Sequence, residues 1–321
     1  MSTWQLPEGI DELTGKQALA FESIRRKLLD LYQDRGFGLV IPPMAEYADS
    51  LLLTSGSLDT KTFKFLDSAS GKMLGIHADI TPQIARIDAK KSSNKIEKYC
   101  YINAILQTRA DDFYASRSPI QAGAELYGSE GIEADIEVIE LMLDSLKLLS
   151  IESIVLSIGN AGIFNSIIDK EELTTGQATQ LRQIFQKRST PDLNLFLSGN
   201  SVINADKFTK LMGLEGESKI LIEALAIFED TPKAKKAILD LIEIDKELVS
   251  KGIEVVYDLA ELKSYYEYHT GVVFSAHSSN FSKAIAQGGR YHGLGELFGK
   301  YKNSRSATGF SFDLKFLSQS I

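Results

Sequence analysis

Several polar side chains are spaced so that they could bind a small ligand together. Gln121 and Glu125 are four residues apart in the segment 120–127, whose composition predicts a strand. Because side chains alternate across a strand, both lie on the same face of the sheet. Two acceptors on one face suit an ammonium group, although a solvated sheet face would carry the same residue types.

Two glycine- or aromatic-rich segments are further candidates for ligand contact. Gly288-Gly289-Arg290-Tyr291 directly follows the predicted strand 284–287. A glycine pair there either forms a simple turn or lets a ligand approach the backbone, and the sequence alone favours neither. The segment 265–271, which contains Tyr268 and His269, is typical of a packed aromatic corner when it is taken alone.

Other chemistries lack their residues. The four histidines, among them His77 and His269, form no HExxH-like helical pair, so no metal site is predicted. Cys100 is the only cysteine, which excludes an intramolecular disulfide and a cysteine-based zinc cluster, and its apolar strand predicts a buried, inert thiol. The chain has no Walker loop, no GxGxxG after a predicted strand and no GxSxG. No cofactor is predicted.

Composition indicates a folded, soluble protein. The chain has 321 residues, of which 44% are hydrophobic, and 43 acidic against 35 basic side chains give a net charge of -8. This balance disfavours a broad nucleic-acid surface. The N-terminus lacks a signal peptide, and no apolar run approaches the ~20 residues that span a bilayer, so a cytoplasmic location is expected.

The predicted elements of the first half of the chain would position the polar residues. Apolar spacing predicts a helix over 16–35 that ends at Gly36, and then a strand over 38–41 that ends at Pro42-Pro43. The segments 62–66 and 72–76 predict a hairpin, and Thr81 is predicted to cap a helix with Pro82 at its first position. Strands are expected at 99–107 and 120–127, and a helix at 132–149.

After a strand at 153–158, the residues from about 163 to 251 predict helices almost throughout, interrupted at Pro191, Gly199-Asn200 and Pro232. Strand patterns return at 253–257, 271–275, 284–287 and 307–312. The sequence therefore predicts an α+β fold in which helices flank a mostly antiparallel sheet. Residues 1–162 and 252–321 are expected to form its core, with 163–251 as a mainly helical insertion.

Read in order, these segments resemble the catalytic core of a class II aminoacyl-tRNA synthetase, specifically the histidyl enzyme. Leu6-Pro7-Glu8-Gly9 resembles its N-terminal signature, and 36–43 resembles motif 1, which forms dimers. The segment 101–128 resembles motif 2, and 307–317 resembles motif 3. Gly288 to Tyr291 matches the histidyl-type GGRY element, so the resemblance covers nearly the whole chain.

The chain departs from the synthetase at three cationic positions. Gln107 stands at the motif 2 arginine that contacts the ATP α-phosphate, and a neutral amide cannot replace a guanidinium fork. The motif 3 arginine falls at Phe316, beside Lys315. A further histidyl-specific arginine falls at Ser264, beside Lys263. The resemblance therefore implies loss of the activation chemistry.

Positions that recognise the amino acid are better preserved. Asp79 and Thr81 match a glutamate and a threonine of the synthetase, Gln121 and Glu125 match its glutamine and glutamate, and Tyr268-His269 match its paired aromatics. The chain ends at Ile321, directly after motif 3, so we expect no anticodon-binding domain and no tRNA as partner. The residues expected to bind free histidine are Asp79, Thr81, Gln107, Gln121, Glu125, Tyr268 and His269, with His77, Arg290 and Tyr291 as further lining.

This combination resembles the regulatory subunits of ATP phosphoribosyltransferase, which are paralogues of the synthetase. The segment 77–86 is very similar to theirs, although His77 stands where arginine is expected. The resemblance implies a non-catalytic subunit that activates a short-form catalytic subunit in the first step of histidine biosynthesis and mediates feedback inhibition by histidine. It also implies a homodimer within a hetero-octamer and no membrane partner. An active or degenerate histidyl-tRNA synthetase and a free-standing histidine sensor remain as alternatives.

Overall fold

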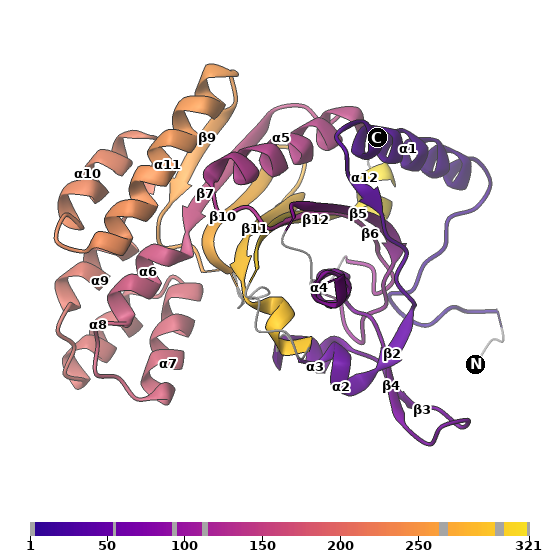
Figure 1. Cartoon of the computed structure of the whole chain (residues 1–321), viewed down its shortest axis with the longest axis horizontal. Coiled ribbons are helices and arrows are strands. Elements are labelled where there is room, and N and C mark those ends of the chain that lie inside the picture. Colours follow the sequence, from indigo (N-terminus) through magenta and orange to yellow (C-terminus); the bar gives the residue numbers. More distant parts are fainter. Residues whose placement is uncertain are drawn as a thin grey trace. The chain divides into compact units, whose positions relative to one another are not determined.

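The computed structural model describes residues 4–53, 56–91, 95–110, 115–262, 269–298 and 305–319 (Figure 1). Backbone contacts divide the chain into two compact units. Unit 1 comprises residues 1–130, 138–152 and 292–321, and unit 2 comprises residues 131–137 and 153–291. The helix α5 (Ile132–Leu148) begins in unit 2 and continues in unit 1.

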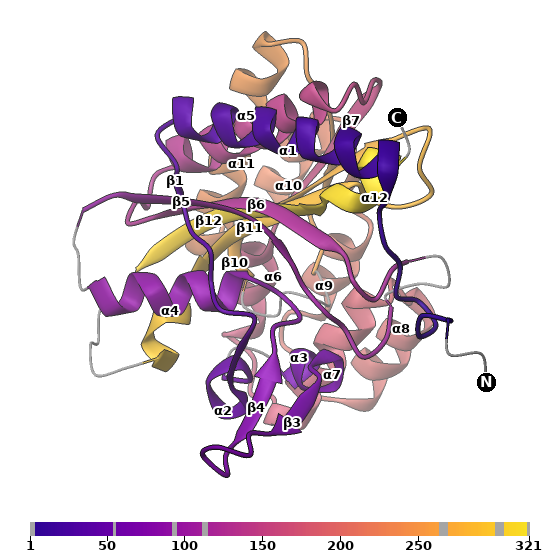
Figure 2. The same cartoon turned by 90° about the vertical axis from the view of Figure 1, so that its right-hand side faces the viewer.

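The main sheet of unit 1 is built mostly from antiparallel pairs. Its strands follow in the order β1 (Gly38–Leu39), β5 (Glu97–Ala104), β6 (Ile120–Tyr127) and β12 (Ser306–Asp313), and only β1 and β5 pair in parallel. The helices α1 (Gly15–Asp34) and α12 (Leu314–Gln319) lie on one face, and α4 (Thr81–Lys91) lies on the other (Figure 2).

The two faces of β6 differ in chemistry. Ala122, Ala124 and Leu126 are at most 2% exposed and pack toward α1 and α12, where Phe310 of β12 meets Tyr32 of α1 in an edge contact. The opposite face carries polar side chains toward α4. Strand alternation thus separates an apolar core from a polar layer, as the spacing of Gln121 and Glu125 predicts.

A small second sheet in unit 1 has the order β2 (Ala45–Tyr47), β4 (Met73–Ile76) and β3 (Lys64–Leu66), all antiparallel. Two short helices, α2 (Ala48–Leu51) and α3 (Gly56–Lys61), precede β3. The predicted hairpin is confirmed. Its turn is held by the Asp67 carboxylate, which accepts from the amides of Ala69 and Ser70, and by Gly71, whose φ of +69° suits glycine.

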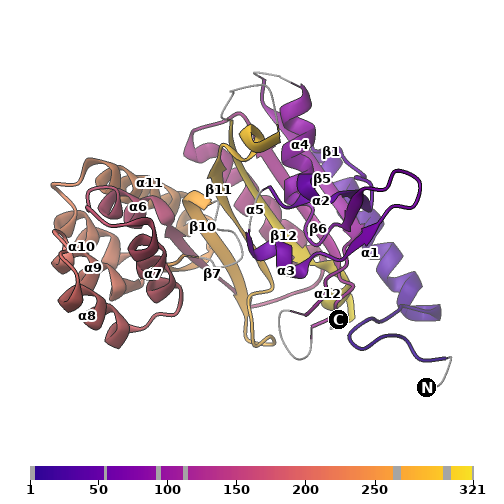
Figure 3. The same ribbon diagram turned by 90° about the horizontal axis from the view of Figure 1, so that it is seen from below.

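The sheet of unit 2 has the order β11 (Ala286–His292), β10 (His269–Ser278), β7 (Ile154–Asn160), β9 (Glu254–Asp258) and the two-residue β8 (Glu215–Gly216). Its helices α6 and α11 pack directly against these strands (Figure 3). Phe164, Phe185 and Phe208 form a fully buried aromatic cluster among the helices. The helices are α6 (Ala161–Ile168), α7 (Thr175–Gln186), α8 (Thr190–Gly199), α9 (Ala205–Met212), α10 (Lys219–Ile227) and α11 (Pro232–Ser250).

Two local predictions are wrong in detail. Thr81 is the first residue of α4 rather than its cap, and its hydroxyl donates to Glu125 of β6. Gly288 and Gly289 lie inside β11 and not after a strand, since the strand extends to His292. A Cβ on Gly289 would lie 2.7 Å from the carbonyl oxygen of Val272, so glycine permits close strand approach there.

Unit 1 also contains a short 3-10 helix, η1 (Leu294–Phe298), which contacts α4. None of the helices in the described ranges is both long and apolar enough to cross a membrane.

Candidate functional site

A polar cluster lies between β6 and the start of α4 in unit 1. The Gln121 side chain donates from Nε2 to Asp79 Oδ1 over 2.8 Å, and its Oε1 accepts from the Ile80 amide over 3.0 Å. Asp79 Oδ1 also accepts from that amide over 2.9 Å. Both ends of the Gln121 amide are therefore oriented, and the strand holds the Asp79 carboxylate in place.

Glu125 forms the second half of the cluster. Its Oε1 accepts from Thr81 Oγ1 over 2.8 Å and from the Tyr101 hydroxyl over 3.4 Å, and the residue is only 2% exposed. A Cβ on Gly309, its cross-strand neighbour, would lie 1.8 Å from Glu125 Oε2. Glycine at this position leaves the space that the carboxylate occupies.

Burial controls the electrostatics of the cluster. Burial raises the pKa of Asp79 above its usual range, although the hydrogen bonds from Gln121 and Ile80 and the positive charge of Lys61 act against this effect. Asp79 and Lys61 are each 8% exposed. The cluster thus contains two buried carboxyl groups, Asp79 and Glu125, with a buried lysine close enough to act on the first.

Sequence reasoning missed Lys61 and Tyr101. Lys61 ends the short helix α3, and its carbonyl oxygen accepts from the amide of Thr108. Thr62 forms an isolated antiparallel bridge with Gln107, which places this segment beside the cluster. Because the odd-numbered residues of β5 share one face of the strand, Tyr101 could have been predicted to lie on the polar face. No feature of the sequence indicates that Lys61 is buried.

Gln107 lies at the edge of the same cluster. It is 8% exposed, and its Nε2 donates to the carbonyl oxygen of Ala78 over 3.2 Å. His77, which directly precedes Ala78, is 1% exposed and is hydrogen-bonded at both ring nitrogens. Unit 1 therefore brings together the predicted residues Asp79, Thr81, Gln107, Gln121, Glu125 and His77.

The remaining predicted residues belong to unit 2 or lie outside the described residues. Arg290 pairs with Asp135 and donates from Nη2 to the Gly131 carbonyl oxygen over 2.7 Å, so it holds the start of α5. The rings of His269 and Tyr291 lie 6.5 Å apart. Tyr268, Lys263 and Ser264 lie outside the described ranges. A ligand-binding role for His269, Arg290 and Tyr291 stays a prediction.

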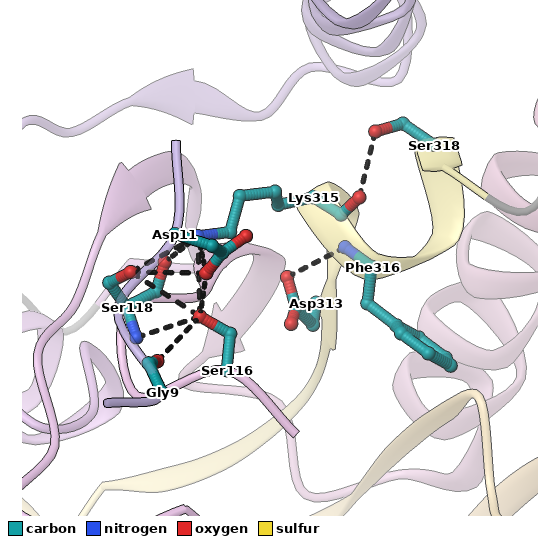
Figure 4. A network of polar contacts seen from close by, with 8 residues as sticks. All are labelled: Gly9, Asp11, Ser116, Ser118, Asp313, Lys315, Phe316 and Ser318. Carbon is teal, nitrogen blue, oxygen red and sulfur yellow. Dashed lines mark hydrogen bonds and ion pairs between the residues drawn. The ribbon is translucent and has the colours of Figure 1, made fainter. Parts of the chain in front are cut away.

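A second polar cluster in unit 1 surrounds Lys315 of α12 (Figure 4). Lys315 Nζ donates to Asp11 Oδ1 over 2.9 Å, to Ser116 Oγ over 3.3 Å and to Ser118 Oγ over 3.2 Å, as well as to the Ser118 carbonyl oxygen. Its side chain is only 5% exposed. The ring of the neighbouring Phe316 points away from this cluster (Figure 4).

The Lys315 cluster ties three distant segments together. Burial raises the pKa of Asp11, but hydrogen bonds from Ser116 and Lys315 outweigh it and hold that pKa below the usual value. Arg117 strengthens the connection, because its Nη1 donates to the Glu8 carbonyl oxygen over 2.9 Å. The lysine near the motif 3 position thus anchors the N-terminal segment to residues 116–118.

The first cluster can recognise a cation with several hydrogen-bond donors. Its acceptors are the carboxylates of Asp79 and Glu125, and an ammonium group offers three donors and no acceptor. Lys61 provides a positive charge close to Asp79, which suits a ligand that also carries a carboxylate. Within the described ranges no three histidine, cysteine or acidic side chains gather as metal ligands.

Comparison with known proteins places this geometry in context. The family model described as histidyl-tRNA synthetase matches residues 9–317. The chain is 42% identical over 319 residues to the ATP phosphoribosyltransferase regulatory subunit of Thiobacillus denitrificans, covering 99% of this chain and 98% of that protein. It is 40% identical to the regulatory subunit of Methylococcus capsulatus, covering 97% of this chain and 78% of that protein.

Solved structures agree on the fold. A Bacillus halodurans protein described as an ATP phosphoribosyltransferase regulatory subunit/histidyl-tRNA synthetase superposes with a TM-score of 0.86 at 24% identity, over 100% of this chain and 84% of that chain. The histidyl-tRNA synthetase of a Nostoc species superposes with a TM-score of 0.79 at 15% identity, over 99% and 75% of the two chains. The predicted class II synthetase-like α+β fold is confirmed.

Proposed function

The chain belongs to the family of ATP phosphoribosyltransferase regulatory subunits, relatives of histidyl-tRNA synthetase, and from this membership we propose that it activates a short catalytic subunit and makes that subunit sensitive to histidine. The regulated reaction is the first step of histidine biosynthesis, and the partner subunit carries the catalysis. The observation that supports ligand sensing best is the buried cluster of Asp79, Thr81, Gln121 and Glu125.

Each polar group of free histidine has a counterpart in this cluster. The α-ammonium group of histidine donates to the Asp79 carboxylate and to the side-chain oxygen of Gln121. These two acceptors are held close together by the hydrogen bonds between the start of α4 and β6. Glu125 accepts from an imidazole N–H, and Thr81 keeps the Glu125 carboxylate in place. The positive charge of Lys61 offsets the negative charge of the ligand's carboxylate. Gln107 lies beside the segment that contains Lys61.

The absence of synthetase activity follows from the cationic positions. Gln107 carries a neutral amide that is engaged with Ala78, and Phe316 is apolar. Lys315 does not substitute for an arginine on ATP, since its ammonium group is bonded to Asp11, Ser116 and Ser118. Without fixed cations, the negative charge that develops during adenylation is not stabilised. We infer that tRNA is not a partner of this chain.

Self-association through the edge strand β1 is the second part of the proposal. β1 pairs on one side with β5 and stands at the end of the sheet order of unit 1. Leu39, Ile41 and Met44 next to this edge are 38%, 71% and 57% exposed, although each is apolar. An unpaired apolar edge is protected when a second copy covers it. The expected state is a homodimer within a hetero-octamer in the cytoplasm.

A sedimentation experiment tests the dimer. Wild-type protein at micromolar concentration should sediment as a dimer, and Ile41→Glu should shift it toward a monomer because a charge would enter the buried seam. Ile222→Glu is the matched control, since Ile222 is 64% exposed in α10 of unit 2. A stable wild-type monomer would contradict self-association.

The segment 163–251 is proposed as a mainly helical insertion in the synthetase-like core. It contains α7 to α11, and Phe164, Phe185 and Phe208 form a buried aromatic cluster among its helices. Feedback requires that histidine bind two states of the assembly unequally, and a coupling of ~1–3 kcal/mol gives a 5- to 150-fold change.

The decisive experiment mixes purified short catalytic subunit with this protein and follows phosphoribosyl-ATP formation with and without histidine. We expect activation by the wild-type chain and inhibition when histidine is added. Glu125→Gln is expected to activate normally but to require at least about tenfold more histidine for inhibition. Unchanged rates in every mixture would defeat the regulatory function and favour a free-standing sensor. Activation without inhibition would defeat only the sensing part.

A further inference from the structure

The imidazole ring of His77 is hydrogen-bonded at both nitrogens in the interior of unit 1. Nδ1 lies 2.7 Å from Gln83 Oε1, and Nε2 lies 2.7 Å from the carbonyl oxygen of Ala104. His77 is 1% exposed, as is Gln83, so no bulk water competes for these contacts. Both distances are short for hydrogen bonds of this type, which indicates well-formed interactions at each nitrogen.

The partner at Nδ1 is an acceptor, and its orientation is set by two further contacts. Gln83 Nε2 donates to the Pro43 carbonyl oxygen over 3.0 Å and to Glu46 Oε1 over 2.8 Å. Turning the amide over would place its oxygen against these two acceptors and its NH2 group against the ring. The oxygen of Gln83 therefore faces His77, and the Ala104 carbonyl oxygen can only accept.

A neutral imidazole cannot satisfy this arrangement. It carries one N–H and one lone pair, so one nitrogen would point its lone pair at a carbonyl oxygen 2.7 Å away. An imidazolium carries a proton on each nitrogen and makes both hydrogen bonds. We propose that His77 is a positioning residue that acts as a buried imidazolium and holds the segment 77–80, which carries Asp79 between β4 and α4, in its binding-competent place. The binding half of this proposal rests on the proposed histidine site.

The backbone around His77 connects the ring to that site. The His77 amide donates to the Met44 carbonyl oxygen and its own carbonyl oxygen accepts from the Leu106 amide, each over 3.1 Å. The next residue, Ala78, accepts from Gln107 Nε2, and Asp79 follows directly. Loss of one ring contact therefore loosens a segment that is fixed on both sides and ends at the ligand-binding carboxylate.

Glu46 and Arg86 are the charged groups nearest to His77 in its hydrogen-bond network. Glu46 of β2 reaches the ring through Gln83 of α4 and also pairs with Arg86 of α4, whose Nη2 lies 2.7 Å from Glu46 Oε1. On the other side, β5 presents the neutral Ala104 carbonyl group. Beyond this network, Asp79 is two residues away and Lys61 acts on it. Glu46 is thus the anion closest in the hydrogen-bond chain to His77.

This assignment predicts a pH response that a purely structural histidine would lack. When the ring loses a proton at high pH, one hydrogen bond is replaced by repulsion between two lone pairs. Histidine affinity should then fall by about tenfold, as expected for loss of a charge-assisted hydrogen bond. His77→Arg keeps a fixed positive charge and several donors, so its affinity should not show this fall. His77→Gln lacks the charge and is expected to bind weakly at every pH.

Imidazole nitrogen NMR on the full-length protein tests the protonation directly, and the chain has only four histidines. The His77 signals, assigned by their disappearance in His77→Arg, should show both nitrogens protonated at pH 7.5 without any ligand. A neutral tautomer at that pH would overturn the proposal, whatever the histidine affinity.

Calorimetry then compares wild type with His77→Arg at each pH between 6.5 and 9. Only the ratio of the two affinities is used, because free histidine itself titrates over this range. The ratio should change by about tenfold, and a constant ratio would defeat the positioning role. If neither protein binds histidine, the proposed function fails. The melting temperatures of the two proteins then decide the role of His77, because they should diverge as the pH rises.

Discussion

Unit 1 contains two polar clusters whose aspartates behave in opposite ways. The Asp79 carboxyl group is buried beside Gln121, and burial raises its pKa. The Asp11 carboxylate is 41% exposed, and Ser116 and Lys315 hold its pKa below the usual value even though burial raises it. The contacts within the first cluster do not fully offset the desolvation of the Asp79 carboxylate. In the second cluster, the hydrogen bonds to the Asp11 carboxylate more than offset its desolvation.

This difference separates recognition from anchoring. In the proposed site, an acceptor whose desolvation is not fully offset before the ligand arrives would favour a cation, and the raised pKa of Asp79 fits that condition. The Lys315 ammonium group already donates to four acceptors, so none of its N–H groups is left to bind a phosphate.

The largest expected effect concerns activation chemistry. Histidine-dependent pyrophosphate exchange by the purified protein should stay at background, because loss of one electrostatic contact in such a site commonly costs ~10²–10³ in rate and at least two cations are missing. An active histidyl-tRNA synthetase assayed in parallel is the positive control. Exchange above background would mean that Lys315 or another cation reaches ATP. The conclusion that the Lys315 cluster only anchors the chain would then be wrong.

The next effect concerns histidine affinity. Glu125→Gln removes a negative charge but keeps an oxygen that can accept from Thr81, so we expect at least a tenfold loss of affinity, or ~1.5–3 kcal/mol, with little change in folding. Calorimetry measures it, and Glu223→Gln on the exposed surface of α10 is the matched control. Equal affinities for the Glu125 variant and the wild type would remove Glu125 from the site.

The Lys315 cluster should respond in stability and not in binding. Lys315→Met leaves Asp11, Ser116 and Ser118 without their shared donor, and we expect a loss of ~1–3 kcal/mol in the free energy of unfolding. Histidine affinity should remain within about twofold of wild type. Chemical denaturation and calorimetry check both, with the exposed Lys246→Met as control. A large loss of histidine affinity would show that the two clusters act as one.

The smallest effect is a gain in stability at the binding site. Because the folded pKa of Asp79 is raised, this group disfavours the folded state increasingly as the pH rises above its usual value of 3.8. Asp79→Asn should therefore stabilise the unliganded protein at pH 8 by about 1 kcal/mol, and this gain should shrink as the pH falls toward 4. The same variant should bind histidine more weakly. Denaturant titrations at several pH values measure the first effect, and a gain that grows at low pH would contradict it.

Much of the fold was predictable because local chemistry is consistent with it. The helix at 16–35, the hairpin at 62–76 and the strands at 99–107 and 120–127 correspond to α1, β3–β4, β5 and β6. Gly36 ends α1 with a φ of +80°, as a glycine at a helix C-terminus predicts. The prediction that Cys100 is buried is confirmed, since it is 0% exposed, and burial raises the pKa of its thiol to about 12, which disfavours the reactive thiolate.

The predictions that failed concern side chains whose partners are far away in sequence. Thr81 has the composition of a cap, but its hydroxyl donates to Glu125, 44 residues away. Gly288 and Gly289 were predicted to follow a strand, yet they lie inside β11, where a side chain at Gly289 would meet the carbonyl oxygen of Val272 in β10. A local rule cannot anticipate these contacts, since they depend on which strands become neighbours.

By itself, the sequence determined the class of the protein, its periodic elements and the shared face of Gln121 and Glu125, because strand alternation and turn chemistry act over a few residues. Only the tertiary structure decided how the charges are used. It buried Lys61 near Asp79, bonded Lys315 to Asp11 and placed carbonyl oxygens at both nitrogens of His77. Burial and hydrogen-bond partners set the behaviour of an ionisable group, and folding brings those partners from distant parts of the chain.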